Sequence, residues 1–205
     1  MIRVAVSVEG ETEEEFINEV VAVHLLERDI HLQPVLLGGD VTVEHLALDM
    51  ADLYWSYDFV TSLVDFYGFR DKGDASIEEL EDRIRKSVVD KIRRSFDESR
   101  IFPYVQLHEF EGLLFSDVNA FGYLEISEET LYELRNIRSQ FLSPEDINDN
   151  TETAPSKRLS SLMPRYDKRV AGTLIALETG LDTIRAECPR FNEWLTRMET
   201  LQEMS

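Results

Sequence analysis

The stretch VAVSVEGETEEEF, Val4 to Phe16, decides the fold because an apolar, β-branched run passes directly into an acidic, helix-forming segment. The run from Ile2 to Val8 predicts a buried first strand that ends at Glu9-Gly10. Thr12 is the predicted N-cap of the following helix, with Glu15 three residues on in capping-box spacing. This helix is predicted to reach about residue 27 along a stripe of Phe16, Val20, Val23 and His24. A strand therefore ends, and a helix begins, within a run of glutamates.

The chain then repeats this alternation of strand and helix. Further strands are predicted at residues 30–37, 59–64 and 101–107, where Pro103 indicates an edge or the start of a strand. Helices are predicted at residues 43–55 and after the N-cap Ser76, the latter along a stripe of Ile77, Leu80, Ile84, Val88 and Ile92. Four alternations predict an α/β fold, a mainly parallel sheet with helices on both faces.

The pattern changes beyond Asp117 to helices separated by turns. Residues 127–137, a segment from about Leu174, and residues 189–201 are the clearest helical stretches. We therefore predict an α/β core at residues 1–118 and a helical C-terminal extension at residues 119–205, packed on the core.

Composition and charge limit the function. The 205 residues carry 41 acidic and 21 basic side chains, for a net charge of −20, which disfavours a simple DNA-binding module. Basic residues gather at 83–100 and at 157–169, and such runs are usually solvated faces. The lone Cys188 forms no internal disulfide, and no apolar run approaches a membrane span, so we expect a cytoplasmic protein without a membrane role.

Acidic residues follow three predicted strands at their carboxyl ends. Glu9 follows the first strand, Asp65 the third, and Glu109 and Glu111 the fourth. Glu13, in the first turn of the helix after Glu9, can point into the same crevice. Sites in parallel sheets form at this edge, and Mg²⁺ prefers oxygen ligands. The sequence therefore predicts a metal site for phosphate chemistry, although acids at a helix start are also favourable without any ligand.

Other routes to chemistry are not supported by motifs. The sequence has no G-x-x-x-x-G-K-[ST] loop, no G-x-G-x-x-G and no glycine-flanked serine nucleophile. The four histidines lack zinc-ligand spacing, and His108 is a site candidate only because it adjoins Glu109.

Four segments, VEGETEEEF, VDFYGF, QLHEFEGLLFSD and INDNTETAPSKR, together resemble the domain of unknown function 4276 family. That family is similar to the TOPRIM nucleases of the overcoming-lysogenisation-defect and RloB types. The resemblance implies a TOPRIM-like sheet of four to five strands and a Mg²⁺-dependent (or Mn²⁺-dependent) site that hydrolyses phosphodiester bonds in DNA or RNA. It also implies a role in anti-phage defence beside an ATPase partner.

The resemblance assigns roles residue by residue. Glu9 matches the TOPRIM glutamate, Glu13 the second acid of E-G-x-T-E, and Asp65 the first aspartate of D-x-D. Tyr67 stands in place of the second aspartate, which puts a two-metal arrangement in doubt unless Asp71, or an acid of the Glu109 and Glu111 pair, substitutes.

A basic side chain is expected to stabilise the charge that develops on phosphate. Lys157 and Arg158, in TAPSKRL, are the candidates, and an ordinary exposed helix start is the alternative.

Two other functions stay open. A non-catalytic regulatory subunit with the same fold would explain the missing aspartate and the negative charge. A phosphoacceptor receiver domain would use Asp65, but it would need a Ser or Thr ending the fourth strand, where the chain has QLHEFE. A homodimer is compatible with the sequence.

Overall fold

The computed structural model describes residues 1–92, 95–148, 153–164 and 166–204. Within these ranges the sheet consists of five parallel strands: β1 (Ile2–Val8), β2 (Ile30–Leu36), β3 (Phe59–Asp65), β4 (Ile101–Phe102) and β5 (Val105–Gln106). Their order is β2-β1-β3-β4, and β5 also pairs with β3. The predicted α/β class with a mainly parallel sheet of four to five strands is confirmed.

The strand registers bring the acidic segments together. Val8 of β1 pairs with Leu63 of β3, so Glu9 follows one residue beyond this pair. Asp65, at the end of β3, pairs with Gln106 of β5. The carboxyl ends of β1, β3 and β5 therefore lie at one edge of the sheet.

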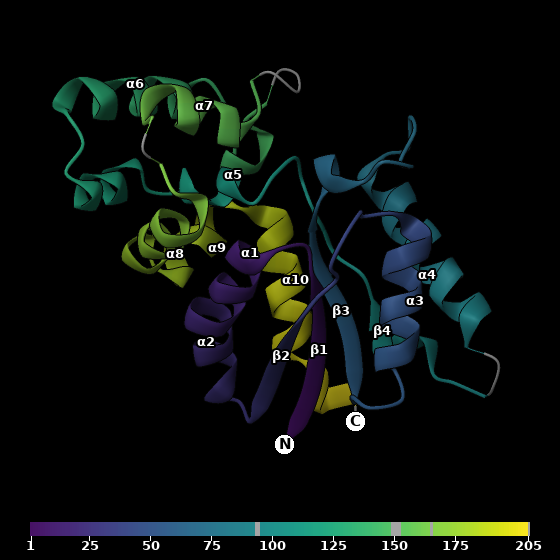
Figure 1. Ribbon diagram of the computed structural model, residues 1–205. Coiled ribbons are helices and arrows are strands. Elements are labelled where there is room, and N and C mark those ends of the chain that lie inside the picture. The colour runs from purple at the N-terminus through teal and green to yellow at the C-terminus, as the bar shows by residue number, and fades with distance from the viewer. Residues whose placement is uncertain (93–94, 149–152, 165, 205) are drawn as a thin grey trace.

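Helices cover both faces of the sheet (Figure 1). On one face lie α3 (Val43–Leu53) and α4 (Ile77–Lys91), whose apolar side chains pack on Ala5, Val60 and Val64. The other face is covered by the helices α1 (Glu11–Phe16), α2 (Ala22–Leu26), α8 (Lys168–Thr179), α9 (Leu181–Glu187) and α10 (Pro189–Glu199). Alternate residues of β1 contribute to the two cores, because successive side chains of a strand point to opposite faces.

Further helices lie at the carboxyl end of the sheet. These are α5 (Glu111–Leu114), α6 (Glu128–Ser139) and α7 (Pro155–Leu162) (Figure 1). Between α1 and α2 the chain forms a π-helical turn, Ile17–Val21, and 3₁₀ turns occur at residues 66–68, 98–100, 118–124, 144–146 and 201–204. None of the helices in the described ranges has the length and apolar content needed to cross a bilayer.

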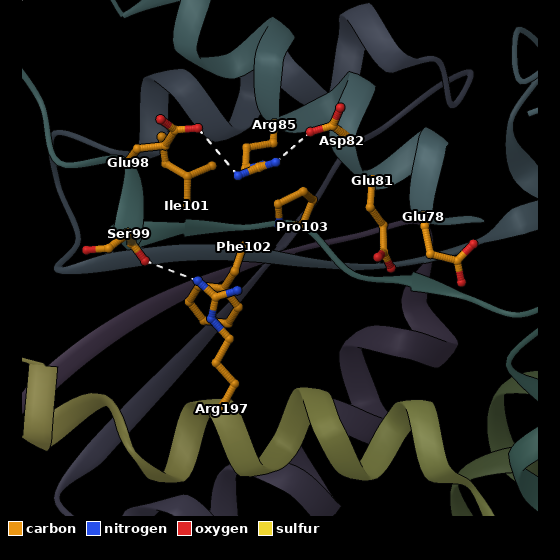
Figure 2. Close-up of a pocket in the computed structure, with 10 residues that line it drawn as sticks. All are labelled: Glu78, Glu81, Asp82, Arg85, Glu98, Ser99, Ile101, Phe102, Pro103 and Arg197. Carbon is orange, nitrogen blue, oxygen red and sulfur yellow. Dashed lines mark hydrogen bonds and ion pairs between the residues drawn. The ribbon is translucent and has the colours of Figure 1, made fainter. Parts of the chain in front are cut away.

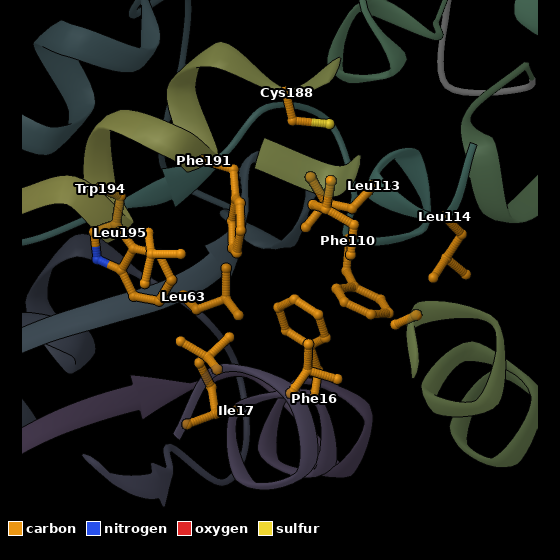
Figure 3. Close-up of a cluster of buried hydrophobic side chains, with 14 of the residues drawn as sticks. Phe16, Ile17, Leu63, Phe110, Leu113, Leu114, Cys188, Phe191, Trp194 and Leu195 are labelled. Carbon is orange, nitrogen blue, oxygen red and sulfur yellow. The ribbon is translucent and has the colours of Figure 1, made fainter. Parts of the chain in front are cut away.

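Aromatic side chains connect the first and last parts of the chain in one core (Figure 3). The ring of Phe16 in α1 lies 5.0 Å, centroid to centroid, from Phe110 and 5.8 Å from Phe191 in α10. Trp194 of α10 donates from its indole N–H to the Thr61 hydroxyl of β3 at 2.9 Å. Residues on both sides of position 118 thus share this core, while the division at 118 itself stays a prediction.

Local details differ from the predictions in the fourth strand, at the start of the first helix and in the stripe of that helix, where Val23 is 60% exposed. The predicted strand 101–107 divides into β4 and β5 around Pro103, which has no N–H to donate. The predicted cap at Thr12 is wrong, because Gly10 is the N-cap and its N–H donates to the Glu13 carboxylate at 3.0 Å. Glu13, not Glu15, therefore provides the capping-box carboxylate.

The predicted N-cap Ser76 is confirmed and forms a capping box with Glu79, which offers a test of local stability. The Ser76 hydroxyl accepts from the Glu79 N–H at 3.2 Å, and the Ser76 N–H donates to the Glu79 carboxylate at 2.9 Å. We expect Ser76→Ala to lower the free energy of unfolding by about 1 kcal/mol, measured by urea denaturation. Ser87→Ala, in the interior of the same helix, is the control and should change it by less than about 0.5 kcal/mol. Equal effects of the two substitutions would contradict the cap.

Candidate active site

Four acidic side chains meet where the parallel strands end. Glu9 follows β1, Asp65 closes β3, Glu111 opens α5 after β5, and Glu13 comes from the first turn of α1. We call these four residues the carboxylate cluster. Three of them are almost inaccessible: the side chains of Glu111, Glu13 and Asp65 are 0%, 3% and 8% exposed.

The ammonium group of Lys168 lies within this cluster. Its Nζ is 3.3 Å from an oxygen of Glu111, 3.4 Å from one of Glu13 and 4.0 Å from one of Asp65. The Lys168 side chain as a whole is 44% exposed. One cation is thus shared among three buried acids from α1, β3 and α5.

The start of α8 fixes the backbone of Lys168. Asp167 is the N-cap, and its carboxylate accepts from the N–H groups of Arg169 at 3.1 Å and Val170 at 3.3 Å. The guanidinium of Arg169 pairs with Glu11 at 2.7 Å and with Glu15 at 2.5 Å. These contacts hold the first turn of α8 against α1, directly beside the cluster.

Lys168 was not identified from the sequence, because it belongs to the basic segment 157–169, which was interpreted as a solvated face. The available signal was local. Asp167 is a good N-cap residue immediately before Lys168, and Val170 and Ala171 begin an apolar helical pattern. Nothing in that pattern specifies that the helix begins against α1.

Several oxygens of the cluster are buried without a hydrogen-bond partner in the described structure. They are both carboxylate oxygens of Glu111, Oε1 of Glu13 and Oε2 of Glu9. The other partners are backbone groups: Asp65 Oδ1 accepts from Phe110 N–H at 2.7 Å, and Glu13 Oε2 accepts from Gly10 N–H. Oε1 of Glu111 and Oε1 of Glu13 face the Lys168 ammonium at 3.3 Å and 3.4 Å. Buried polar atoms are normally satisfied, so Oε2 of Glu111 and Oε2 of Glu9 need a further cation, water or substrate group.

Gly68 packs closely against Glu9. A Cβ atom at position 68 would lie 2.3 Å from Oε2 of Glu9, much closer than any van der Waals contact. A side chain here would have to displace the Glu9 carboxylate. Gly68, the glycine of VDFYGF, therefore leaves the space that the Glu9 carboxylate occupies.

Burial changes the pKa values in the cluster. Burial raises the pKa of Asp65 well above its ordinary value, an effect that Lys168 opposes and Glu13 and Glu111 reinforce. The pKa values of Glu111 and Glu9 are also raised, mainly by burial. For Lys168, burial lowers the pKa, but the surrounding carboxylates outweigh it and raise the pKa overall.

Other predicted residues lie around the cluster or outside it. Glu109 uses one oxygen to accept from Ser156 N–H, at 2.8 Å, in the first turn of α7. Lys157, also in α7, is exposed and lines a hollow with Ile137 and Leu162. Of INDNTETAPSKR, residues 149–152 lie outside the described ranges. The predicted roles of Glu109 and Lys157 stay predictions.

Of the three acids considered as substitutes for the missing second aspartate, Glu111 alone joins the cluster. Asp71 accepts from Val43 N–H at 3.1–3.2 Å and so caps α3. Tyr67, at the aspartate's position, stacks on His108 with ring centroids 5.4 Å apart, and its hydroxyl accepts from Asn148. His108 has a positive φ of 63° and a pKa lowered mainly by burial.

Tyr166 is a further neighbour that the sequence analysis did not single out. Its hydroxyl is buried with no hydrogen-bond partner in the described structure. Burial raises its pKa, and the nearby Glu111 charge adds to this. The phenol is therefore a neutral hydrogen-bond donor beside the cluster.

The cluster has the right donors for a hard cation but is not a ready-made metal site. In the described ranges, no three His, Cys, Asp or Glu side chains are arranged to hold a metal ion as they stand. Lys168 lies between the acids instead. The buried oxygens without hydrogen bonds nevertheless match the ligands that Mg²⁺ prefers, so the residues fit such an ion chemically.

The basic segment at residues 83–100 lies along α4 and β4, away from the cluster. A hollow of 340 Å³ there is shown in Figure 2. Arg85 pairs with Asp82 at 2.5 Å and with Glu98 at 3.5 Å, and Lys86 pairs with Asp82. Lys91 pairs with Glu44. These cations are bound to carboxylates of the chain itself, while Arg93 and Arg94 lie outside the described ranges.

Comparison with known proteins gives one family and one similar structure. The family model described as a domain of unknown function, DUF4276, matches residues 8–199. A solved structure titled as the C-terminal region of the Xanthomonas campestris pv. campestris OLD protein covers 98% of this chain and 98% of that chain, with 14% identity and a TM-score of 0.49. Among curated proteins, none matches the sequence.

The raised pKa of Asp65 gives a pH-dependent test of the cluster. Because the folded protein binds a proton that the unfolded chain has lost, stability falls as pH rises from the ordinary value of 3.8 through the raised pKa. Asp65→Asn removes the charge and keeps an acceptor for Phe110 N–H. In EDTA, its Tm relative to the wild type should therefore increase between about pH 4 and pH 7.

Asp82→Asn is the control, since its exposed carboxylate has a pKa lowered by Lys86 and Arg85. Its contribution to stability is present above the unfolded pKa and lost as pH falls, so the relative Tm should not rise with pH. A pH-independent difference between Asp65→Asn and the wild type would contradict the buried charge.

Proposed function

The chain belongs to the domain of unknown function 4276 family, and from this premise we propose that it is a Mg²⁺-dependent TOPRIM-like nuclease that hydrolyses phosphodiester bonds in DNA or RNA. The observation that carries the proposal is the carboxylate cluster, in which buried oxygens without hydrogen bonds adjoin a lysine at the ends of parallel strands. Such an arrangement is suited to bind a metal and a phosphate together.

The proposed metal ligands are Glu9, Glu13, Asp65 and Glu111. When bound, the ion supplies electrostatic stabilisation of phosphoryl oxygens and a lower pKa for a coordinated water. Glu109 remains a weaker candidate, because one of its oxygens accepts from the backbone of α7. The metal would also offset the negative charge that otherwise repels the substrate.

The chain's own residues have two tasks in hydrolysis. Lys168 donates hydrogen bonds to a non-bridging phosphate oxygen, where negative charge develops as water attacks phosphorus. Glu9 is the most accessible acid of the cluster and has a raised pKa, so it accepts the proton of the attacking water. The bond from phosphorus to the leaving oxygen breaks, and that oxygen takes a proton from solvent.

Access to nucleic acid requires help from outside the chain. The net charge is −20, and the described basic residues at 85, 86 and 91 pair with acids of the same chain. We therefore propose a partner that supplies a basic surface, in line with the ATPase that the family resemblance implies. Phage defence is the proposed setting.

A second candidate is a non-catalytic subunit. It is favoured by two observations: Lys168 already pairs with three acids of the cluster, and Tyr67 replaces an expected ligand. In this function the charged cluster is a structural element, and the protein acts by binding its partner.

Cleavage assays distinguish the two functions. Supercoiled plasmid, single-stranded DNA and total tRNA are incubated with purified protein in Mg²⁺, Mn²⁺ or EDTA, alone and with the copurifying partner. We expect metal-dependent cleavage, reduced about 10²–10³-fold by Glu9→Gln and by Lys168→Ala, because each removes a group that acts on the developing charge.

Glu14→Gln is the matched control, because Glu14 lies in the first turn of α1, next to Glu13, but outside the carboxylate cluster. It should retain cleavage. Equal activity of Glu9→Gln and the wild type would exclude the proposed role of Glu9. A complex that binds its ATPase but cleaves no substrate in any metal would establish the non-catalytic function.

A further inference from the structure

The positions of Lys168 and Tyr67 bear on how many metal ions the proposed site holds. This question rests on the proposed function, because it concerns the same carboxylate cluster. Nuclease sites of the two-metal kind hold their ions about 4 Å apart and need acidic ligands for both. The carboxylate cluster offers ligands for one ion but not for a second.

The ligand for a second ion is missing where the sequence pattern would place it. Tyr67 offers a phenol, which is stacked on His108 and hydrogen-bonded by Asn148. Asp71 is bound to the N-terminus of α3, and Glu109 to that of α7. The remaining substitute, Glu111, is fully buried and lies 3.3 Å from Lys168.

Lys168 already provides a positive charge inside the cluster. Its Nζ lies within 4.0 Å of oxygens of Glu13, Asp65 and Glu111. A second metal ion in this position would have to bind the same carboxylate oxygens. A dication there would repel the ammonium strongly, since both would lie against carboxylates that are at most 8% exposed. The Asp167 cap and the Arg169 pairs hold the lysine backbone in place.

One region of the cluster is left for a metal. Glu9 has no ion pair within 4 Å in the described structure, and its buried Oε2 accepts no hydrogen bond. Gly68 leaves room for this carboxylate. Oε2 of Glu111 is likewise buried without a hydrogen bond, whereas Oε1 of Glu111 and Oε1 of Glu13 face Lys168.

We propose that the site binds a single divalent cation, on the Glu9 side of the cluster, and that the ammonium group of Lys168 permanently takes the place of a second one. The protein thus combines one exchangeable cation with one that is part of its chain. The class of ligand is a hard divalent ion with oxygen preference.

Counting bound Mn²⁺ tests this directly. The full chain, freed of metal with EDTA and dialysed, is titrated with Mn²⁺ while electron paramagnetic resonance measures the free ion, and native mass spectrometry checks the count. We expect one Mn²⁺ per wild-type chain. Lys168→Gln should bind two, and Lys168→Arg, which keeps the charge, should bind one.

Lys86→Gln is the control for loss of one positive charge, because this lysine is 72% exposed on α4. It should bind one ion, as the wild type does. Circular dichroism establishes that each variant is folded before counting, and the wild-type count stands even if Lys168→Gln fails to fold.

The outcomes separate this inference from the proposed function. Two ions in the wild type would overturn the single-ion site but leave a metal-dependent nuclease intact. One ion in both the wild type and folded Lys168→Gln would overturn the role of Lys168. No bound ion in the wild type would overturn the inference and the proposed metal site together.

Discussion

The attraction between Lys168 and three buried carboxylates is the interaction on which the carboxyl end of the sheet depends. Isolated charges are costly to bury, and a shared cation with fixed geometry reduces that cost without removing it. The remaining imbalance is visible in the raised pKa values of Asp65 and Glu111 and in the oxygens without hydrogen bonds. A fold that keeps such a cluster sacrifices stability for a local charge distribution.

Much of the fold was predictable because periodicity reports which side chains are buried. The ends of the first and third strands, at Val8 and within one residue of Asp65, follow directly from apolar runs, and the helix start follows from the N-cap residue Ser76. The stripe in the first helix was less accurate. Val23 is 60% exposed and Leu25 is buried, because the π-helical turn between Ile17 and Val21 changes the phase of the helix.

The acids of the candidate site were easier to predict than their partner. Parallel strands bring their carboxyl ends together, so acids at those ends must be neighbours. Lys168 is more than 50 residues from Glu111 in sequence, and its position depends on how α8 packs on α1. Sequence spacing carries no information on that packing, so Lys157 of α7 and Lys168 of α8, whose ammonium contacts three buried acids, could not be told apart.

Phe16, Phe110 and Phe191, from distant parts of the chain, share the core on one face of the sheet, and this has a consequence for synthesis of the chain. The acids at positions 9, 13, 65 and 111 leave the ribosome well before Lys168 and the helices that close the core. Until then the acids lack their shared cation, and α8, α9 and α10 are absent from the face of the sheet that they cover. The order of synthesis therefore completes the carboxylate cluster only after α8 has been made.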